Sequence, residues 1–539
     1  MSARRLLGSV AGAATMIAGL TILSRVVGFG RWLGQSYAVG DTAIGDAYAT
    51  ANTLPNILFE VAAGGALAGA VVPLLAGPLA AHVRPDVDRI ASALLTWALA
   101  VLTPIAVLVA LLARPIVEAL PTGPGVAGAA LAAQVEAGSY FLVVFAPQIV
   151  LYGVGVVLTG ILQAQRRFFF PALAPLLSSL VVIVAYLAFA ATALDLQESP
   201  ALLPAESLRW LAWGTTAGVA AMSLPLFVPV LRSGVRLRPT FRFPPGVAVR
   251  ARNLAAAGLG ALLAQQLAVL VTLGLAKAAG PLGTYNVFQY SQAVYFLPYA
   301  VLAVPLATAV FPRLAATAAE SDHGAYTRIA SWSTSAVVVV GALGAAALVA
   351  VAPAVQVMFT ALGRGDIEGM TGALTWMAPG LVGFALVFHV SRALYAVDKG
   401  RAAVAATAAG WVTVVVASFV GVALLVPEGG DGPATLVALA GGNSVGMTLA
   451  GVALLVVLAR VCGGLPGLGR TAGVALAGAL IGALVGRWTA ATVLDLAGSG
   501  VLAAVLAGLL GASVVGASVV GAMVVGDRAR IREWRGAGA

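Results

Sequence analysis

The chain has 539 residues, of which 61% are hydrophobic and only 9% charged, and its mean hydropathy is +1.01. Soluble proteins are about one-quarter charged, so this composition excludes a soluble globular protein. One cysteine and three histidines exclude an internal disulfide and a cysteine–histidine metal cluster.

Long apolar runs predict an all-α polytopic membrane protein. A helix needs about 20 apolar residues to cross a bilayer, and runs of this length are typical of helices rather than of barrel strands. The 64 glycines suit helices that pack closely. We predict 14 transmembrane spans, near residues 10–38, 46–79, 90–113, 134–163, 171–193, 209–231, 253–278, 284–316, 328–352, 370–396, 402–426, 434–459, 471–493 and 498–525.

Two arginines lie inside the first span, Arg25 and Arg31. A charged side chain at membrane depth costs at least ~2.5–3.5 kcal/mol, and such residues usually face a bundle interior or a watery cavity. The guanidinium keeps its charge and matches phosphate or carboxylate, which predicts a cavity that receives an anion. On a straight helix the two side chains are ~120° and ~9 Å apart, and Gly28 and Gly30 would allow a bend that brings them together. The alternative is that Arg31 extends to the outer interface.

The second span carries two acidic residues, Asp46 and Glu60. Asp46 stands at the outer start of the span, where it has either a functional role or the stabilising role of a carboxylate at a helix N-terminus. Glu60 needs a partner if it is ionised in an apolar span. We predict a pair with Arg25 or Arg31, which is either a gate or a static structural ion pair.

A further polar pair, His389 and Arg392, lies in the tenth span. It forms either a second polar site or, for Arg392, an anchor at the inner membrane surface. Proline 55 and Pro298 lie within long spans, where we predict kinks.

The charges of the connections predict the orientation. With the N-terminus inside, cytoplasmic segments hold 23 of the 30 basic residues and outer segments five; Arg25 and Arg31 are the other two. This asymmetry predicts that both termini are cytoplasmic. The net charge of +10 is therefore a sign of topology, and no nucleic-acid partner is expected.

The two halves of the chain repeat some features. A Leu-Pro pair occurs at Leu54-Pro55 and at Leu297-Pro298, and short basic links occur at 163–167 and 397–401. The offset is six spans each time, which is typical of parallel transporter halves. We predict an N-terminal lobe (1–231), a cytoplasmic basic linker (232–252), a C-terminal lobe (253–460), two extra helices (461–527) and a basic cytoplasmic tail (528–539).

Several segments resemble the MurJ (MviN) lipid II flippases, of the multidrug/oligosaccharidyl-lipid/polysaccharide exporter superfamily. They are Ser24-Arg25-Val26-Val27-Gly28-Phe29-Gly30-Arg31, Gly45-Asp46-Ala47-Tyr48, Leu54-Pro55-Asn56, Gln163-Ala164-Gln165-Arg166-Arg167-Phe168, Pro171-Ala172-Leu173-Ala174-Pro175 and Phe311-Pro312-Arg313-Leu314. The resemblance implies two six-helix lobes plus two C-terminal helices around a cationic cavity, and alternating access. It also implies substrate-binding roles for Ser24, Arg25, Arg31 and Asp46.

Three positions depart from the pattern of that family. Trp32 stands in place of an acidic residue, Phe59-Glu60 in place of a basic pair, and Gln292-Ala293 where an arginine is common. Two interpretations remain open: lineage variation of an actinobacterial type with the same role, or a paralogue with another lipid-linked load.

The predicted function is a transporter, not an enzyme, that moves lipid II from the inner to the outer leaflet of the plasma membrane. Arg25 and Arg31 would bind the diphosphate of this polyprenyl-linked saccharide. No cofactor is expected. Moving two negative charges outward across ~100 mV is favoured by ~5 kcal/mol, so the membrane potential could drive transport, and a coupled cation is left open.

Cell-wall synthesis machinery is a possible partner. The alternatives are a flippase for another polyprenyl-linked saccharide and a cation-coupled drug exporter. A polyprenyl-dependent glycosyltransferase is disfavoured, because the outer connections are too short for a catalytic domain.

Overall fold

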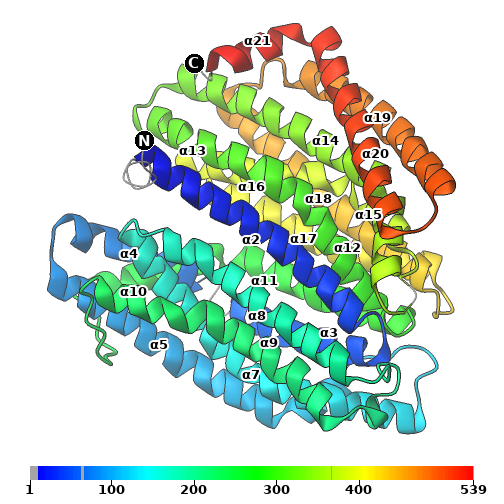
Figure 1. The fold of residues 1–539 in the computed structure, drawn as a ribbon. Coiled ribbons are helices and arrows are strands. Elements are labelled where there is room, and N and C mark those ends of the chain that lie inside the picture. The colour runs from blue at the N-terminus through cyan, green and yellow to red at the C-terminus, as the bar shows by residue number, and fades with distance from the viewer. Residues whose placement is uncertain (1–9, 62–65, 366, 538–539) are drawn as a thin grey trace. The chain divides into compact units, whose positions relative to one another are not determined.

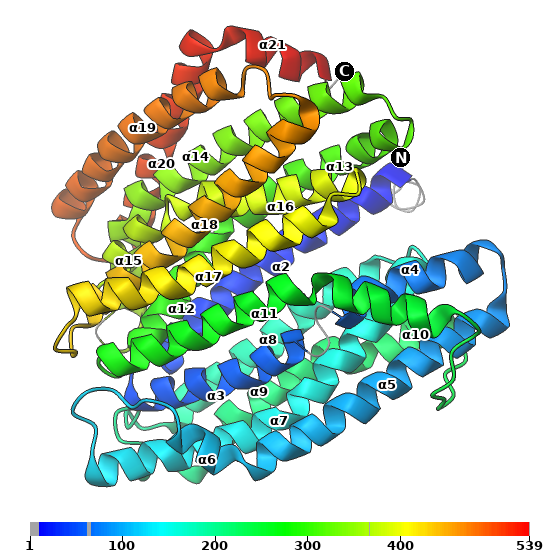
Figure 2. The same ribbon diagram turned by 180° about the vertical axis from the view of Figure 1, so that it is seen from behind.

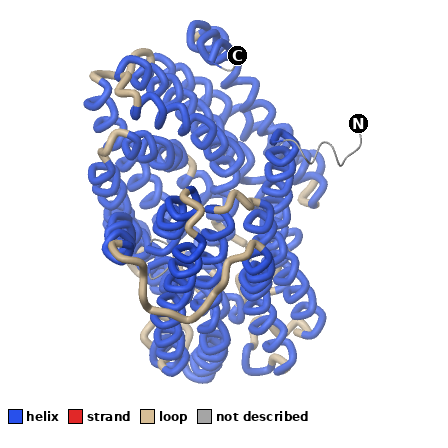
Figure 3. Tube along the Cα trace, turned by 90° about the vertical axis from the view of Figure 1, so that its left-hand side faces the viewer, coloured by secondary structure: helices blue, strands red, loops and turns tan. Residues whose placement is uncertain are grey.

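The computed structural model describes residues 10–61, 66–365 and 367–537 of the chain. Helices and the loops between them make up this whole part, with no strand among its residues (Figure 1, Figure 3). Among the described residues, eleven helices are long and apolar enough to cross a membrane, and two more that meet at a bend of 47° make a twelfth if the pair is one span. The prediction of an all-α polytopic membrane protein is confirmed.

The apolar helices follow the predicted spans closely. The twelve candidate spans coincide, in order, with the last twelve predictions. The first predicted span is helix α2 (Val10–Ala38), with the predicted bounds. The second predicted span, 46–79, is divided between α3 (Ala43–Phe59) and α4 (Ala66–Ala80), and residues 62–65 between them lie outside the described part.

The chain divides into two compact units, Met1–Gln266 and Leu267–Ala539. In the first unit α7 packs against α3, α4, α5 and α9, while α2 packs against α8. Besides α2, α3 and α4, this unit contains α5 (Arg84–Leu111), α6 (Ala113–Glu118), α7 (Gly128–Ala164), α8 (Phe169–Thr192), η2 (Pro200–Leu202), α9 (Ala205–Ser223), η3 (Leu224–Leu226), α10 (Phe227–Arg232) and the first part of α11 (Val247–Ala279).

In the second unit α14 packs against α13, α15, α16, α19 and α20. The last two long helices, α19 and α20, lie side by side, and α21 follows them (Figure 2). The remaining bounds are α12 (Thr284–Pro298), η4 (Tyr299–Ala303), α13 (Val304–Ala319), α14 (His323–Leu362), α15 (Met370–Met377), α16 (Gly380–Ala396), α17 (Gly400–Leu425), α18 (Gly432–Cys462), α19 (Leu468–Ala497), α20 (Val501–Gly526) and α21 (Arg528–Ala537).

The boundary between the two units agrees only approximately with the predicted lobe boundaries. The division at Gln266 falls inside α11, and α11 begins at Val247, within the linker predicted over 232–252. Most of the tail predicted over 528–539 is the helix α21. The predicted assignment of lobes, linker and tail stays a prediction.

The connection between α10 and α11 lies along α5. Backbone N–H groups of every second residue donate to side chains spaced four apart on α5: Arg236 to Asp88 (3.0 Å), Arg238 to Ser92 (2.9 Å) and Thr240 to Thr96 (3.1 Å). An extended segment advances about 6.6 Å in two residues, and a helix advances about 6 Å in four. The donors on the connection and the acceptors on α5 therefore have nearly the same spacing.

Both Leu-Pro pairs precede a π-helical segment. After Pro298 the chain is π-helical over Tyr299–Ala303, and after Pro55 the residues Glu60 and Val61 are π-helical. A proline removes one backbone donor from the helical ladder, and π turns accommodate such irregularities and often mark functional sites. The predicted kink sites therefore carry a shared feature that supports the internal repeat.

Glycines set the closest helix contacts of the second unit. Helices α16 and α18 meet at Gly383, where a Cβ atom would lie 2.1 Å from the backbone oxygen of Met447. Gly451 meets the backbone of Gly383 in the same contact. By contrast, a Cβ atom on Gly441 of α18 would have no neighbour within 4 Å. Small residues thus let the α16 and α18 backbones touch, as is common between membrane helices.

Cysteine labelling should place residues 196–206 outside the cell and residues 232–252 inside it. One apolar stretch, Ala205–Arg232, lies between the two segments, and the loop charges predict which end is cytoplasmic. Single cysteines are introduced in a Cys462→Ser background and tested with a membrane-impermeant maleimide on intact cells. Labelling of both segments from one side would contradict the predicted topology.

Candidate functional site

The middle of α2, from Gly19 to Val26, is largely exposed and carries Arg25. Its neighbours Ile22 and Val26 are 66% and 63% exposed, and Arg25 itself is exposed, next to the half-buried Ser24. No hydrogen bond or ion pair holds the Arg25 guanidinium among the described residues. Helix α2 is continuous through Gly28 and Gly30, and neither glycine is in close contact with a neighbour. The predicted bend is therefore not needed to form the helix.

The second half of α2 is fixed by a buried hydrogen-bond network. The Tyr186 hydroxyl of α8 donates to Gln35 Oε1 (3.1 Å) and lies 2.9 Å from the Tyr48 hydroxyl of α3. The Tyr48 hydroxyl lies 3.0 Å from Thr215 Oγ1 of α9. Four helices thus share one chain of polar groups, whose partners are satisfied inside an apolar bundle. This network anchors α2, and the anchored end positions the arginines.

Arg31 lies between the exposed and the anchored parts of α2. Its Nε atom is buried and has no hydrogen-bond acceptor among the described residues, and its guanidinium carbon is 5.3 Å from the ring centroid of Trp32. Arg31 is also close enough to Tyr48 and Tyr152 to act on both electrostatically. A buried donor without an acceptor is unfavourable by about 1–3 kcal/mol, so a ligand oxygen bound here would be favoured. The buried Nε favours an anion-binding role over simple extension to the interface.

Glu60 lies near the same tyrosine. It is half-buried at the end of α3, in the π-helical turn, and acts electrostatically on Tyr152 together with Arg31. The preceding Phe59 stacks on the Tyr152 ring, with centroids 4.8 Å apart. Among the described residues no ion pair joins Glu60 to Arg25 or Arg31. The structure thus brings Arg31, Tyr152 and Glu60 into one neighbourhood but leaves the predicted pair unformed.

Asp46 lies at the opposite end of α3 from Glu60, about 21 Å along the helix. It is 2% exposed in the first turn of α3, where its backbone N–H donates to the Thr42 carbonyl (2.9 Å). The Thr42 hydroxyl caps the helix by accepting from Gly45 N–H (3.2 Å). Arg25 lies 13 residues before the end of α2, about 20 Å along the helix axis from the turn that leads to α3. The position of Asp46 favours the stabilising role of a carboxylate at a helix N-terminus.

The tenth predicted span contains a separate polar pair. His389 is 1% exposed, and its Nε2 lies 3.1 Å from Ser333 Oγ of α14. Arg392 donates from Nη1 to Thr308 Oγ1 of α13 (3.2 Å), and its guanidinium carbon is 3.7 Å from the Phe388 ring centroid. Both side chains thus join helices within the second unit, which favours a structural role.

Sequence reasoning missed Tyr152, Tyr186 and Gln35. A tyrosine in an apolar span is a weak signal, because its ring packs like any other apolar group and only its hydroxyl needs a partner. A regular spacing does not mark these residues, which come from α7, α8 and α2.

A family model and a curated relative match most of this chain. The family model described as "Lipid II flippase MurJ" matches residues 35–508. The lipid II flippase MurJ of Burkholderia cenocepacia is 27% identical over 396 residues, which are 70% of this chain and 72% of that protein.

Two solved structures show similar folds. A lipid II flippase MurJ in an inward closed conformation matches with a TM-score of 0.69 at 16% identity, over 93% of this chain and 98% of the other. A multidrug resistance MATE family transporter in an inward-facing conformation matches with a TM-score of 0.64 at 16% identity, over 83% and 98%. At this identity, these matches concern the fold alone.

Proposed function

Because this chain belongs to the MurJ family of lipid II flippases, we propose that it carries lipid II from the inner to the outer leaflet. The protein is a multi-pass membrane transporter and not an enzyme. The load is an amphiphile with a saccharide head, an anionic diphosphate and a polyprenyl tail. A transporter of such a molecule must bind its charged head while the tail stays in lipid.

The observation that carries the proposal is the state of the two arginines on α2. Arg25 is exposed without a partner among the described residues, and Arg31 has a buried Nε without an acceptor. Guanidinium groups bind phosphate oxygens by strong charge-assisted hydrogen bonds. The two arginines would bind the diphosphate, with Ser24 as an additional hydrogen-bond donor. Asp46 would act indirectly, by stabilising the start of α3.

The energy source in this proposal is the membrane potential. A negative head that moves outward across ~100 mV gains ~2.3 kcal/mol per charge. We place the protein in the plasma membrane with both termini in the cytoplasm, as the loop charges predict. Cell-wall synthesis enzymes are the proposed partners, since they make and consume such a load.

Complementation tests the proposal directly. A bacterial strain depleted of its own lipid II flippase should grow when this chain is expressed. Its spheroplasts should also expose newly made lipid II on the outer surface. Normal membrane expression without growth or exposure of lipid II would refute lipid II as the load. Flipping assays in vesicles that contain another polyprenyl-diphosphate saccharide would then test the alternative substrate.

Replacing Glu60 by glutamine should change flipping but leave the amount of folded protein unchanged. The structure contains no ion pair that this change would break among the described residues, so the loss of about 3–5 kcal/mol that follows from a broken buried pair is not expected. A gate that pairs with Arg31 in another state would lose its closing interaction, and the flipping rate should change several-fold. Folded protein is measured by size-exclusion chromatography and flipping in vesicles.

The matched control for this variant is Glu118→Gln, which removes an exposed acid whose Oε1 lies 2.8 Å from Arg114 Nε. It should leave both quantities unchanged. A Glu60→Gln variant that is normal in both would end the gate hypothesis, and one that fails to fold would show that Glu60 has a structural role.

A further inference from the structure

An apolar groove lies on the first unit between α8 and the segment from α9 to α10. Its volume is about 310 Å³, within the range of small-molecule pockets. Its apolar lining includes Leu177, Ala221 and Val228. The remaining lining residues are Phe170, Leu173, Ala174, Met222, Pro225, Leu226 and Pro229, with the two arginines Arg167 and Arg232.

Local sequence explains why the groove forms at this place. Further along the two helices, Gly214 and Gly218 of α9 bring its backbone against Ala185 and Val182 of α8. After Ser223 the chain leaves the α-helical path for the 3-10 turn Leu224–Leu226, which contains Pro225. The close glycine contact ends where this turn begins. The two helices are left with a space between them, which is the groove.

Two cationic side chains flank the groove. Arg167 follows the end of α7 and Arg232 ends α10, and both are exposed. Neither guanidinium has a hydrogen bond or ion pair to the residues that the structure describes. Both belong to segments that the loop charges predict to be cytoplasmic. An apolar groove thus leads to two unpaired positive charges at the end of the helices that the loop charges predict to be cytoplasmic.

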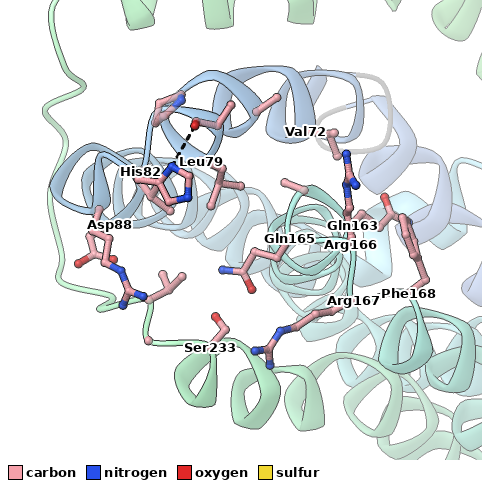
Figure 4. A pocket seen from close by; sticks show the side chains of 18 residues that line it. Val72, Leu79, His82, Asp88, Gln163, Gln165, Arg166, Arg167, Phe168 and Ser233 are labelled. Atoms are coloured by element: carbon pink, nitrogen blue, oxygen red, sulfur yellow. Dashed lines mark hydrogen bonds between the residues drawn. The ribbon is translucent and has the colours of Figure 1, made fainter. Parts of the chain in front are cut away.

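Arg167 also lines a second cavity of about 730 Å³, whose lining mixes polar and apolar side chains. Figure 4 shows Gln165 pointing into this cavity and Arg167 extending toward Ser233. The Gln165 Oε1 atom is buried and has no donor among the described residues. The cavity also contains His82, Arg166 and the Asp88 carboxylate, whose Oδ1 accepts from the Arg236 backbone N–H (Figure 4). Polar donors, the Asp88 carboxylate and the unsatisfied Gln165 Oε1 therefore line a cavity that shares Arg167 with the apolar groove.

We propose that this pair of cavities binds an anionic phospholipid of the inner leaflet. One acyl chain occupies the apolar groove, Arg167 and Arg232 bind the phosphate, and the polar headgroup extends toward Gln165. The site is separate from Arg25 and Arg31 on α2, and its occupant is a resident lipid rather than the transported load.

Charge and shape select this occupant. A zwitterionic lipid brings its own cation to the phosphate and gains less from two arginines than an anionic lipid does. Basic pockets between membrane helices on the cytoplasmic side suit anionic headgroups, because each basic residue near the membrane surface attracts negative charge. The buried acceptor Gln165 Oε1 favours a headgroup with hydroxyl donors, such as the glycerol of phosphatidylglycerol.

Native mass spectrometry of the full-length protein in detergent tests the proposal. Phosphatidylglycerol should remain bound under conditions that remove phosphatidylcholine. The double variant Arg167→Gln/Arg232→Gln should weaken phosphatidylglycerol binding about 10-fold or more, as expected from the loss of two charge-assisted contacts. Ala221→Phe, which fills the groove without removing a charge, should weaken it as well.

Two matched variants control for charge and for bulk. Arg242→Gln removes an exposed charge of the same connection outside both cavities, and Val184→Phe adds bulk on an exposed face of α8 outside the groove. Both should bind phosphatidylglycerol as the unmodified protein does, and thermal melting confirms that every variant is folded. Equal retention of the two lipids, or unchanged binding by the double variant, would overturn the proposal. So would binding of a polyprenyl diphosphate in place of phosphatidylglycerol, since the groove would then belong to the load.

Discussion

Replacing Arg25 by alanine is expected to abolish flipping while the protein remains in the membrane. The side chain is exposed and has no hydrogen bond or ion pair among the described residues, so its removal leaves no partner uncompensated. A hydrogen bond to a charged group is worth about 1.5–3 kcal/mol, which corresponds to a ~10- to 150-fold loss of affinity for the diphosphate. Complementation and a flipping assay measure the effect. Arg25→Lys should restore only part of the activity, because lysine lacks the planar fork that binds two oxygens at once.

The control for this prediction is Arg209→Ala, which removes an exposed arginine from the start of α9. That variant should flip normally. Wild-type flipping by Arg25→Ala would remove Arg25 from the binding site, and loss of the protein from the membrane would assign it a structural or topological role instead.

Replacing Gly383 by alanine should destabilise the second unit strongly. The added methyl group would lie 2.1 Å from the Met447 carbonyl oxygen of α18, and a backbone atom cannot move aside as a flexible side chain can. Overpacking in a well-packed core usually costs about 1–3 kcal/mol, and this contact requires two helices to separate. We expect a lower melting temperature in detergent and less folded protein after extraction.

Gly441→Ala provides a control with the same chemical change. A methyl group there has no neighbour within 4 Å, and alanine is about 0.8–1.0 kcal/mol more favourable than glycine in a helix. This variant should be as stable as the unmodified protein or slightly more stable. Equal melting temperatures for Gly383→Ala and the unmodified protein would mean that α16 and α18 do not pack as closely as described.

The transmembrane spans could be predicted because the bilayer makes one requirement of every span. Each helix must be apolar over about 20 residues, and the local sequence alone shows whether a segment meets this requirement. The last twelve predictions accordingly coincide with the apolar helices of the structure. Boundaries were less certain where polar residues continue a helix beyond the membrane, as at Val247, where α11 begins before its apolar part.

The site was only partly predictable. A sequence shows which charged residues lie at membrane depth, but it does not show which side chains contact them. Arg25, Arg31 and Glu60 were identified by their charge alone. The neighbourhood of Arg31 and Glu60 depends on Tyr152 of α7, which follows both residues by far more than one helix length, and no local pattern reports such a contact. The sequence alone left two roles open for Asp46, substrate binding and stabilisation of a helix N-terminus. The burial of the first turn of α3 bears on this choice, and it cannot be read from the sequence.

The groove between α8 and α10 was not predicted at all. Arg167 and Arg232 were recognised only as positive charges that set the orientation of the chain. Their position beside one apolar groove results from the packing of α8 against α9 and from the turn at Pro225. Such a juxtaposition is a tertiary property, and one sequence contains no periodic trace of it.

The π turn after Pro298 allows a short part of its helix to rotate about the helix axis. It holds one residue more than a continuous α ladder of the same length. Passing this residue along the helix exchanges hydrogen bonds one at a time, and each side chain it passes rotates by about 100° and advances about 1.5 Å. Tyr299, which packs edge-on against Phe384 and Phe388 of α16, stands at the start of that turn. A short stretch of side chains can thus point in a new direction while the far ends of α12 and α13 keep their places.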